Sequence, residues 1–211
     1  MRIAVIGHGR SPEDRGWGKK IDACDLVLRM WDWEWQAAAD CGRRYDHGVV
    51  ALDQRQLEAW RRRHSATPAV SWLGFMRDGL PAHPAMEPLD PARWNEIAAK
   101  LRTPGKSRTF NLTRGCAAVC WAIKRAGADG DVVLVGFDNL RRGRLLPEEE
   151  AFGPAYLAHY DAAYPDWRRW SGYQAGETRC GSHDIAVERQ LLGVLCAETG
   201  NTLTFAEDLW P

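Results

Sequence analysis

The N-terminal stretch IAVIGHGRSPEDRGWGKKIDACDLVLRM, residues 3–30, contains two short apolar runs separated by a glycine-rich polar segment. The first run, Ile3 to Ile6, stops at Gly7, and the second covers Leu26 to Leu28. Short apolar runs that end at glycines are typical of buried parallel strands, and α/β proteins hold ligands at the carboxyl ends of such strands. We therefore predict an α/β protein in which Gly7 and Gly9 face a ligand. These glycines lack the third glycine of a dinucleotide fingerprint, so an ordinary turn explains them equally well.

Length and composition predict one globular domain over residues 1–211. The chain has 28 basic and 28 acidic residues, so its overall charge gives no reason to expect nucleic acid or an anionic membrane as a partner. Neither a signal peptide nor a membrane-spanning apolar run is present, and the six cysteines have no zinc-like spacing. We expect a cytoplasmic protein without disulfides, metal or cofactor; the oligomeric state stays open.

Further along the chain, apolar runs predict strands at Val49–Leu52, Val70–Phe75, Val132–Phe137 and Thr202–Phe205. Amphipathic or alanine-rich segments predict helices at Gln54–Arg63, Pro91–Leu101 and Cys116–Ala126, and a last helix that Ser182 caps. Residues 77–91, with several prolines and glycines, are expected to form a surface excursion. The charged stretch 141–150 is expected to be a mobile loop.

The run Trp31-Asp32-Trp33-Glu34-Trp35 alternates aromatic and acidic residues. In an extended chain this period would place three indoles on one face, and burial of that face against the core is the simpler interpretation. The eleven tryptophans of the chain also suit recognition of a sugar or a base. The composition therefore suggests a binding site without locating it.

Several blocks, taken in their order along the chain, resemble the sialyltransferase family, glycosyltransferase family 29. The large motif of that family is similar to the run from Gly7 through Gly16-x-Gly18, Ile21 and Asp22 to Arg29 and Met30. The small motif is similar to Thr113-Arg114-Gly115 with Val133–Phe137, which includes Gly136. Two shorter motifs resemble His159-Tyr160 and the pair His183 and Glu188.

The resemblance implies a single Rossmann-like domain with a mostly parallel central sheet flanked by helices, in the glycosyltransferase A-like variant of the sialyltransferases. It implies metal-independent, inverting transfer of a sugar, sialic acid or a related ulosonic acid, from a CMP-activated donor to a hydroxyl of a glycan or another acceptor. His183 would be the general base, and His159 and Tyr160 would stabilise the departing phosphate. The nucleotide would be held by Gly7, His8, Gly9, Arg29, Trp31, Thr113, Arg114, Gly115, Gly136 and Phe137.

The residues themselves support part of this chemistry. A histidine at a helix N-terminus is held neutral by the helix dipole, as a general base requires, although a surface histidine in a capping turn is the simpler explanation of His183. Five residues along a helix turn by about 500°, so Glu188 cannot pair locally with His183 and is expected to anchor its helix to donors elsewhere. His159 and Tyr160 could donate to phosphate oxygens or be ordinary packed aromatics.

The chain also departs from the family at two positions. His8 and Trp31 stand where the family usually has asparagines associated with CMP, and Arg114 adds a cation that could compensate. The family's cysteine pair and anchor helix are absent, as expected of a soluble bacterial or viral relative. Two alternatives stay open: a transferase for another nucleotide-sugar, conceivably acting on a modified nucleic-acid base, and a nucleotide-binding module without activity.

Overall fold

The computed structural model describes residues 1–52, 71–76, 86–89, 92–101, 112–164, 173–174, 177–178 and 184–210. Its strands are β1 (Arg2–Ile6), β2 (Leu26–Met30), β3 (His47–Leu52), β4 (Ser71–Met76), β5 (Met86–Leu89), β6 (Asp131–Val135), β7 (Tyr173–Gln174), β8 (Glu177–Thr178) and β9 (Thr202–Phe205). Its helices are α1 (Gly18–Asp22), α2 (Ala38–Cys41), α4 (Ala92–Leu101), α5 (Arg114–Ala126), α6 (Asp138–Arg142), α7 (Glu148–Ala151), α8 (Pro154–Ala163), α10 (Ile185–Thr199) and α11 (Ala206–Leu209).

Seven strands form one sheet in the order β5-β4-β3-β2-β1-β6-β9, and every pairing in it is parallel. The chain runs outward from β1 to β5 and then returns to the other side of β1 as β6. This reversal makes the boundary between β1 and β6 a topological switch point, the place where open α/β sheets bind ligands. The predicted Rossmann-like α/β class is confirmed. β7 and β8 form a separate antiparallel pair.

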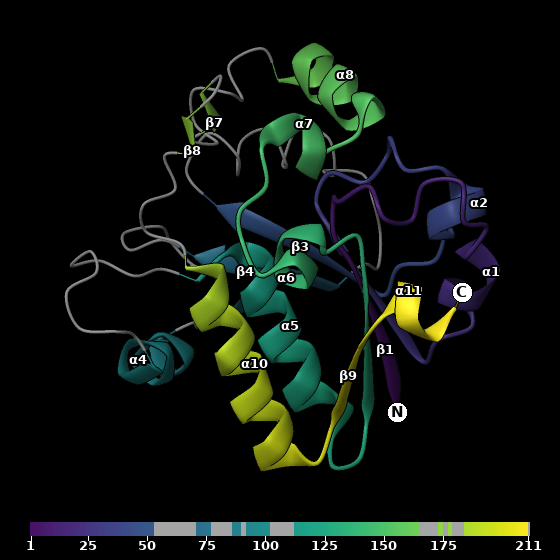
Figure 1. The fold of residues 1–211 in the computed structure, drawn as a ribbon. Coiled ribbons are helices and arrows are strands. Elements are labelled where there is room, and N and C mark those ends of the chain that lie inside the picture. Colours follow the sequence, from purple (N-terminus) through teal and green to yellow (C-terminus); the bar gives the residue numbers. More distant parts are fainter. Residues whose placement is uncertain are drawn as a thin grey trace.

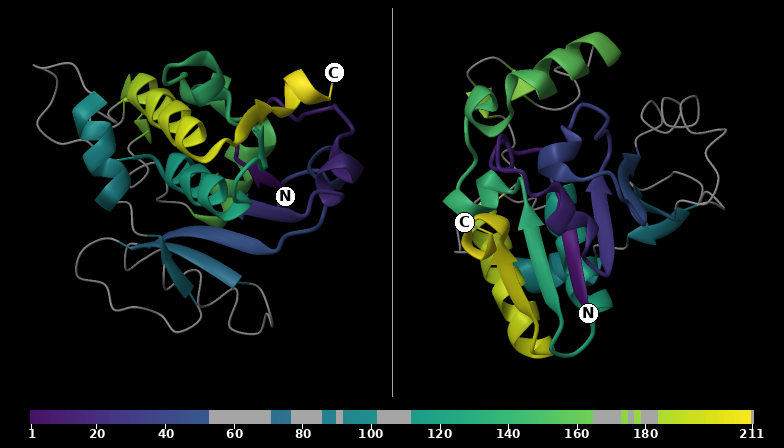
Figure 2. Two further views of the ribbon diagram at one scale, coloured as in Figure 1. Left: turned by 90° about the horizontal axis from the view of Figure 1, so that it is seen from below. Right: turned by 90° about the vertical axis from the view of Figure 1, so that its right-hand side faces the viewer.

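Helices cover both faces of the sheet because alternate residues of the central strands point to opposite sides. Ile3 and Val5 belong to a core cluster that contains residues of α4, α5 and α10, whereas Ala4 and Ile6 pack with residues of α1, α2 and α11. The two views in Figure 2 show these two helical layers with the strands between them. Burial on both faces explains why the strands are continuous apolar runs.

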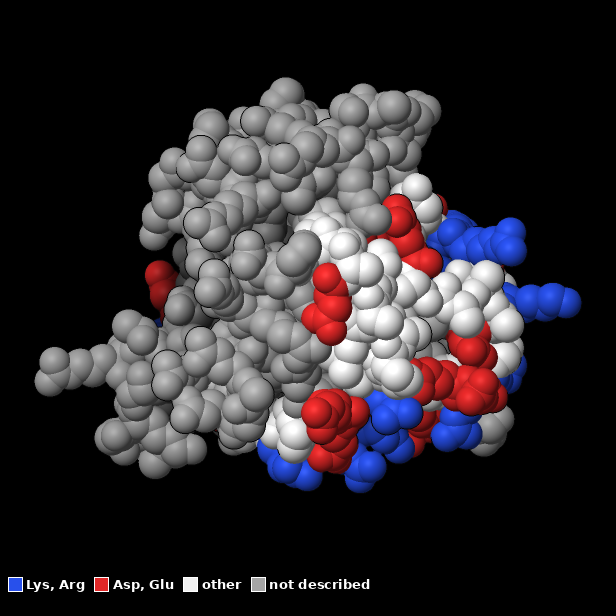
Figure 3. Space-filling view, turned by 90° about the horizontal axis from the view of Figure 1, so that it is seen from above, with Lys and Arg blue, Asp and Glu red and all other residues white. Residues whose placement is uncertain are grey.

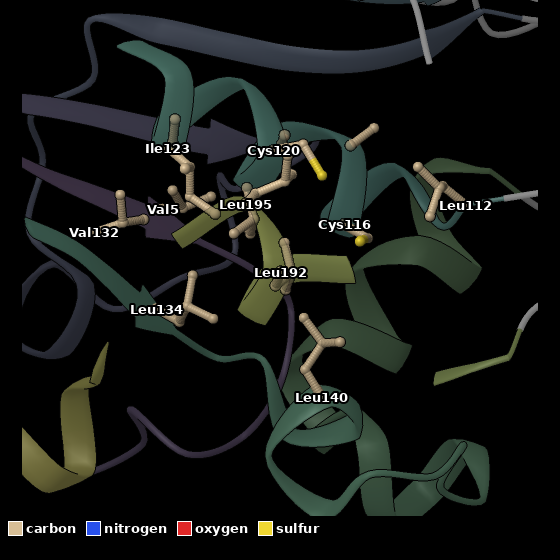
Figure 4. Packing of buried hydrophobic residues seen from close by; sticks show 14 of the residues in the cluster. Val5, Leu112, Cys116, Cys120, Ile123, Val132, Leu134, Leu140, Leu192 and Leu195 are labelled. Carbon is tan, nitrogen blue, oxygen red and sulfur yellow. The ribbon is translucent and has the colours of Figure 1, made fainter. Parts of the chain in front are cut away.

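The larger core cluster joins β1 and β6 to α5 and α10. Val5 and Leu134 face Cys120 and Ile123 of α5, and Leu192 and Leu195 of α10 pack beside them (Figure 4). Helix α10 ends at Thr199 and is capped by Gly200, whose φ of 71° lies in the left-handed region that glycine adopts most easily. Its length of 15 residues, close to the 13 of α5, lets the two helices cover the sheet together (Figure 1).

The strand predictions agree with the structure, whereas three local expectations are wrong. Residues 141–150 are not a loop throughout, because α6 ends at Arg142 and α7 begins at Glu148. The 77–91 excursion contains β5, whose Pro88 is tolerated because the strand lies at the edge of the sheet. Asp184, not Ser182, caps α10, since its carboxylate accepts from the Val187 N–H at 3.3 Å. The predicted helix at Gln54–Arg63 lies outside the described residues.

None of the described helices combines the length and apolar composition that a membrane span requires. The five described cysteines are all free thiols. Seen from above in Figure 3, acidic and basic side chains are intermingled over the described part of the surface.

Candidate functional site

The glycines that follow β1 and β6 bring these two strand ends into direct contact. The Gly7 N–H donates to the Val135 carbonyl and the Gly9 N–H to the Gly136 carbonyl, both at 2.8 Å. A Cβ on Gly7 would lie 2.5 Å from the Gly136 carbonyl oxygen, so no larger residue fits there. The loop after β1 and the loop after β6 therefore touch each other. Glycine at these positions is needed for backbone packing at the switch point.

His8 lies directly after β1, between the glycines, and points toward the end of β2. Its Nε2 is 3.1 Å from the Met30 carbonyl oxygen. Because a carbonyl only accepts, Nε2 carries the proton, and Nδ1 of the neutral ring is an acceptor. Burial lowers the pKa of His8 to about 4, with the Met30 hydrogen bond opposing this shift, so the ring is neutral at pH 7. The rings of Trp35, Tyr156 and Tyr160 lie around it.

Helix α8 lies beyond the carboxyl ends of the strands (Figure 1) and brings His159 and Tyr160 to the segment after β2. His159 Nε2 is 3.1 Å from Oδ2 of Asp32, and the Tyr160 hydroxyl accepts from the Asp32 N–H at 2.9 Å. The same hydroxyl donates to the Trp31 carbonyl at 3.3 Å. Tyr160 is buried, and burial raises the pKa of its phenol. In this arrangement Tyr160 holds the backbone of the β2 loop.

Arg29 and Trp31 are both buried. The Arg29 guanidinium, 1% exposed, donates to the carbonyls of Arg44 and Cys41 and to the Gln36 amide oxygen at 3.2 Å. Gln36 in turn donates to the Gly7 carbonyl at 2.8 Å. Arg29 therefore fixes the segment 36–44 against the end of β1, and a nucleotide contact by Arg29 stays a prediction.

The expected single face of indoles does not form. Trp31 packs edge-on against Tyr164, Trp33 lies against Tyr45, and Trp35 contacts the ring of His8. Residues 33–36 form a turn in which the Gln36 N–H donates to the Trp33 carbonyl at 2.9 Å. The alternation of residue types therefore did not indicate an extended chain.

Thr113 caps α5 at the same edge of the sheet. Its hydroxyl accepts from the Cys116 N–H at 3.1 Å and donates to Oε2 of Glu188 at 3.0 Å, while its N–H donates to Oε1 of Glu188 at 2.5 Å. Glu188 is fully buried, and this burial raises the pKa of its carboxyl to about 7 although the Thr113 hydrogen bonds favour the charged form. The prediction that Glu188 anchors α10 to donors elsewhere is confirmed.

The two residues after Thr113 differ in exposure. Arg114 is exposed at the first position of α5, and its charge is felt by both His8 and Tyr160. Gly115 is packed against the ring of Phe137, which a Cβ at this position would approach within 3.0 Å. Arg114 is therefore placed where a negatively charged ligand could be held above the strand ends.

The structure thus brings most of the predicted residues to one edge of the sheet. His8, Trp31 and Phe137 lie at strand ends and Arg114 at a helix start on this side, and the hydroxyl of Tyr160 in α8 reaches the same edge. His183, the predicted base, lies outside the described residues, immediately before the cap of α10. The sequence pattern does not predict Asp32 at this edge, because Asp32 lies within the alternating run of tryptophans and acidic residues. Its position two residues beyond β2 was the available signal, since polar residues after strand ends commonly carry function.

Among the described residues, no group of three or more histidine, cysteine, aspartate or glutamate side chains could hold a metal ion.

Comparison with known proteins gave structural likenesses only. The chain aligns with the crystal structure of a mammalian sialyltransferase at 18% identity and a TM-score of 0.48, over 96% of this chain and 68% of the other. It also aligns with a mammalian sialyltransferase in complex with Gal-beta-1-3GalNAc-ortho-nitrophenol at 19% identity and a TM-score of 0.46, over the same shares. No protein family and no curated protein matches the sequence. Likenesses of this size do not decide the function of the chain.

Proposed function

We propose that the protein is an inverting, metal-independent glycosyltransferase that uses a CMP-activated sugar, sialic acid or a related ulosonic acid. One observation carries the proposal: the segments that resemble the sialyltransferase motifs, far apart in sequence, meet at the carboxyl edge around the switch point. The segments are 7–9, 29–32, 113–115, 136–137 and 159–160. The convergence supports a donor nucleotide at this edge.

In the proposed reaction an acceptor hydroxyl oxygen attacks the anomeric carbon of the donor. The bond between that carbon and the phosphate oxygen breaks, and the electron pair leaves with CMP. His183 takes the proton of the hydroxyl, and attack opposite to the leaving group inverts the anomeric centre. Arg114 and His159 balance the charge that develops on the phosphate.

His8 decides which group of the sugar donor binds beside it. A neutral imidazole whose Nε2–H is used by the Met30 carbonyl offers only the Nδ1 lone pair, which repels phosphate oxygens and accepts from hydroxyl groups. We place a ribose or sugar hydroxyl on His8 and the phosphate near Arg114. In the family that the sequence resembles, asparagines are associated with CMP. In this protein His8 would bind the hydroxyl and Arg114 the phosphate.

Ligand-induced stabilisation tests the donor assignment. CMP at about 100 times its Kd should stabilise the native protein by about 2.7 kcal/mol and raise its Tm, because the ligand binds only the folded state. UDP and GDP at equal concentration should raise Tm less. A shift with UDP or GDP but none with CMP would show that the donor nucleotide is misassigned.

Two arginines of α5 provide a matched pair for the phosphate contact. Arg114→Ala should lower the affinity for CMP by about tenfold, as expected for one charge-assisted contact, and leave the affinity for cytidine unchanged. Arg125→Ala, which removes an exposed arginine at the other end of the helix, should change neither affinity. Equal effects of the two substitutions would contradict a phosphate at Arg114.

Measurements of turnover test whether His183 is the general base. His183→Ala and His183→Asn should reduce sugar transfer, and slow donor hydrolysis, by at least about 100-fold, while CMP affinity stays within about threefold. Mass spectrometry of the products with a panel of glycan acceptors identifies the acceptor class. Unchanged turnover in both variants would remove His183 from the mechanism.

A further inference from the structure

Asp32 is a buried carboxylate that the proposed reaction does not yet use. Its side chain is 2% exposed, and it lies in the loop that follows β2. A carboxylate buried in this way costs several kcal/mol unless donors surround it, so its presence requires partners. Oδ1 accepts from the Glu34 N–H at 3.2 Å, and Oδ2 receives His159 Nε2 at 3.1 Å and the Tyr164 hydroxyl at 3.2 Å.

The backbone of Asp32 is held as firmly as its side chain. Its N–H donates to the Tyr160 hydroxyl at 2.9 Å, and its carbonyl accepts from Trp35 Nε1 at 2.9 Å. Tyr160 and Tyr164 are one helical turn apart and belong to the same face of α8 and its C-terminal end. Asp32 is therefore bound to α8 and its C-terminal end at three positions, through its backbone N–H by Tyr160 and through its carboxylate by His159 and Tyr164.

We infer that Asp32 is a positioning residue that fixes the imidazole of His159 with its proton on Nε2 and its Nδ1 toward the ligand. An ionised carboxylate only accepts, so the 3.1 Å contact requires a proton on Nε2. Among the described residues Nδ1 makes no hydrogen bond, and the His159 side chain is 17% exposed. Carboxylates that orient an imidazole in this way also stabilise the imidazolium when the other nitrogen is protonated.

The surrounding charges fit this role. Within the described part of the chain, His159 contacts Asp32 and the ring of Tyr160, the Tyr164 hydroxyl donates to the same Asp32 oxygen, and the nearby ring of His8 is neutral at pH 7. Arg114 adds a positive charge within electrostatic reach of His8 and Tyr160. With Asp32 balancing its charge, an imidazolium at 159 can donate from Nδ1 to an anion without adding a second uncompensated cation.

The identity of that anion, the leaving phosphate of the donor, rests on the proposed function. The tautomer and the orientation of His159 do not. The inference can therefore be tested first in the protein without ligand, by nitrogen-15 NMR of labelled histidine at about pH 8. Long-range proton–nitrogen correlations should show the Nε2–H tautomer for His159. A proton on Nδ1 in the wild-type protein would overturn the inference whatever the protein catalyses.

Kinetics then separates positioning from folding. Asp32→Asn should lower kcat by about 100-fold or more, leave KM and CMP affinity within about threefold, and change the tautomer population of His159. Asp129→Asn makes the same change at an exposed position before the start of β6, at the opposite edge of the sheet, and should keep kcat within about threefold. If kcat is unchanged in Asp32→Asn, or falls equally in Asp129→Asn, Asp32 does not act through His159.

The two proposals fail in different ways. If the protein turns over no CMP-sugar but His159 has the Nε2–H tautomer, the proposed donor is wrong and the positioning role of Asp32 stands. If the protein turns over CMP-sugar but His159 has the Nδ1–H tautomer, the transferase activity stands and Asp32 has no part in it. If Asp32→Asn does not fold, the wild-type tautomer alone decides.

Discussion

Replacing Glu188 by glutamine should change how the stability of the protein depends on pH. The carboxyl is fully buried, and its pKa of about 7 lies well above the ordinary 4.5 because burial disfavours the charge more than Thr113 favours it. Between pH 4.5 and 7 the folded state keeps the proton while the unfolded state releases it. Stability from this group is therefore full below pH 4.5 and is lost as pH rises through 7.

The size of the effect follows from the same shift. Each pH unit over which only the folded state holds the proton contributes about 1.4 kcal/mol, so the loss from pH 4.5 to 8 is about 3 kcal/mol. Glutamine has the same shape and does not titrate. Its oxygen can accept from the Thr113 N–H, and its amide can donate to the Thr113 hydroxyl. The stability of Glu188→Gln relative to wild type should therefore rise by about 3 kcal/mol over this pH range.

Urea unfolding of both proteins at half-unit steps from pH 4.5 to 8.5 measures the difference directly, because other titrating groups cancel between them. Glu198→Gln, at an exposed position of the same helix, is the control and should give a flat difference. A flat curve for Glu188→Gln would refute the reasoning. It would mean that the hydrogen bonds from Thr113 hold the carboxylate ionised in spite of its burial.

Three further outcomes are expected from the structure. In the wild-type protein, the neutral His8 contributes up to about 3 kcal/mol to the free energy of unfolding above pH 6.5, and this contribution is lost as the pH falls to 4. His8→Asn should remove this pH dependence, and the same urea series checks it. Gly9→Ala should lower the free energy of unfolding by more than about 2 kcal/mol, because its Cβ would lie 2.7 Å from the Gly136 carbonyl oxygen; Gly193→Ala, with open space around it in α10, should instead add about 0.5–1 kcal/mol. Asn201→Ala should cost about 3 kcal/mol in thermal or chemical unfolding without changing CMP affinity, since the Ile123 carbonyl loses its amide donor and the Gly130 N–H keeps only a long contact of 3.4 Å with the Gly127 carbonyl; a loss below 1 kcal/mol would contradict this.

The sequence could predict every strand of the seven-stranded sheet except β5, because each of these strands is a local apolar run. Runs such as those at Ile3–Ile6 and Val132–Val135 are buried on both faces, and a continuous apolar segment ending at glycine has few other uses. The helix at Cys116–Ala126 followed from its alanine-rich composition, and the anchoring role of Glu188 followed from helix geometry alone. The fold class was therefore available before any tertiary contact was known.

Asp32 shows what local reasoning misses. Its partners His159 and Tyr164 are 127 and 132 residues away, and only the docking of α8 over the strand ends brings them to its carboxylate. The charge runs around Arg141 suggested a loop, whereas Arg141 is paired with Asp208 of α11 at 2.8 Å and belongs to a helix. In both cases the structural role of a polar residue depends on its contacts with an element that is distant in the sequence.

The sequence by itself determined where the chain is buried, where it can turn, and that glycines stand at the ends of β1 and β6. Only the tertiary structure decided that these glycines pack against each other, that the tautomer of His8 is set by the Met30 carbonyl, and that Asp32 holds His159. The physical reason is the range of the forces involved. Burial patterns repeat every two or four residues along the chain, whereas a hydrogen bond is specified only when both partners are within about 3 Å.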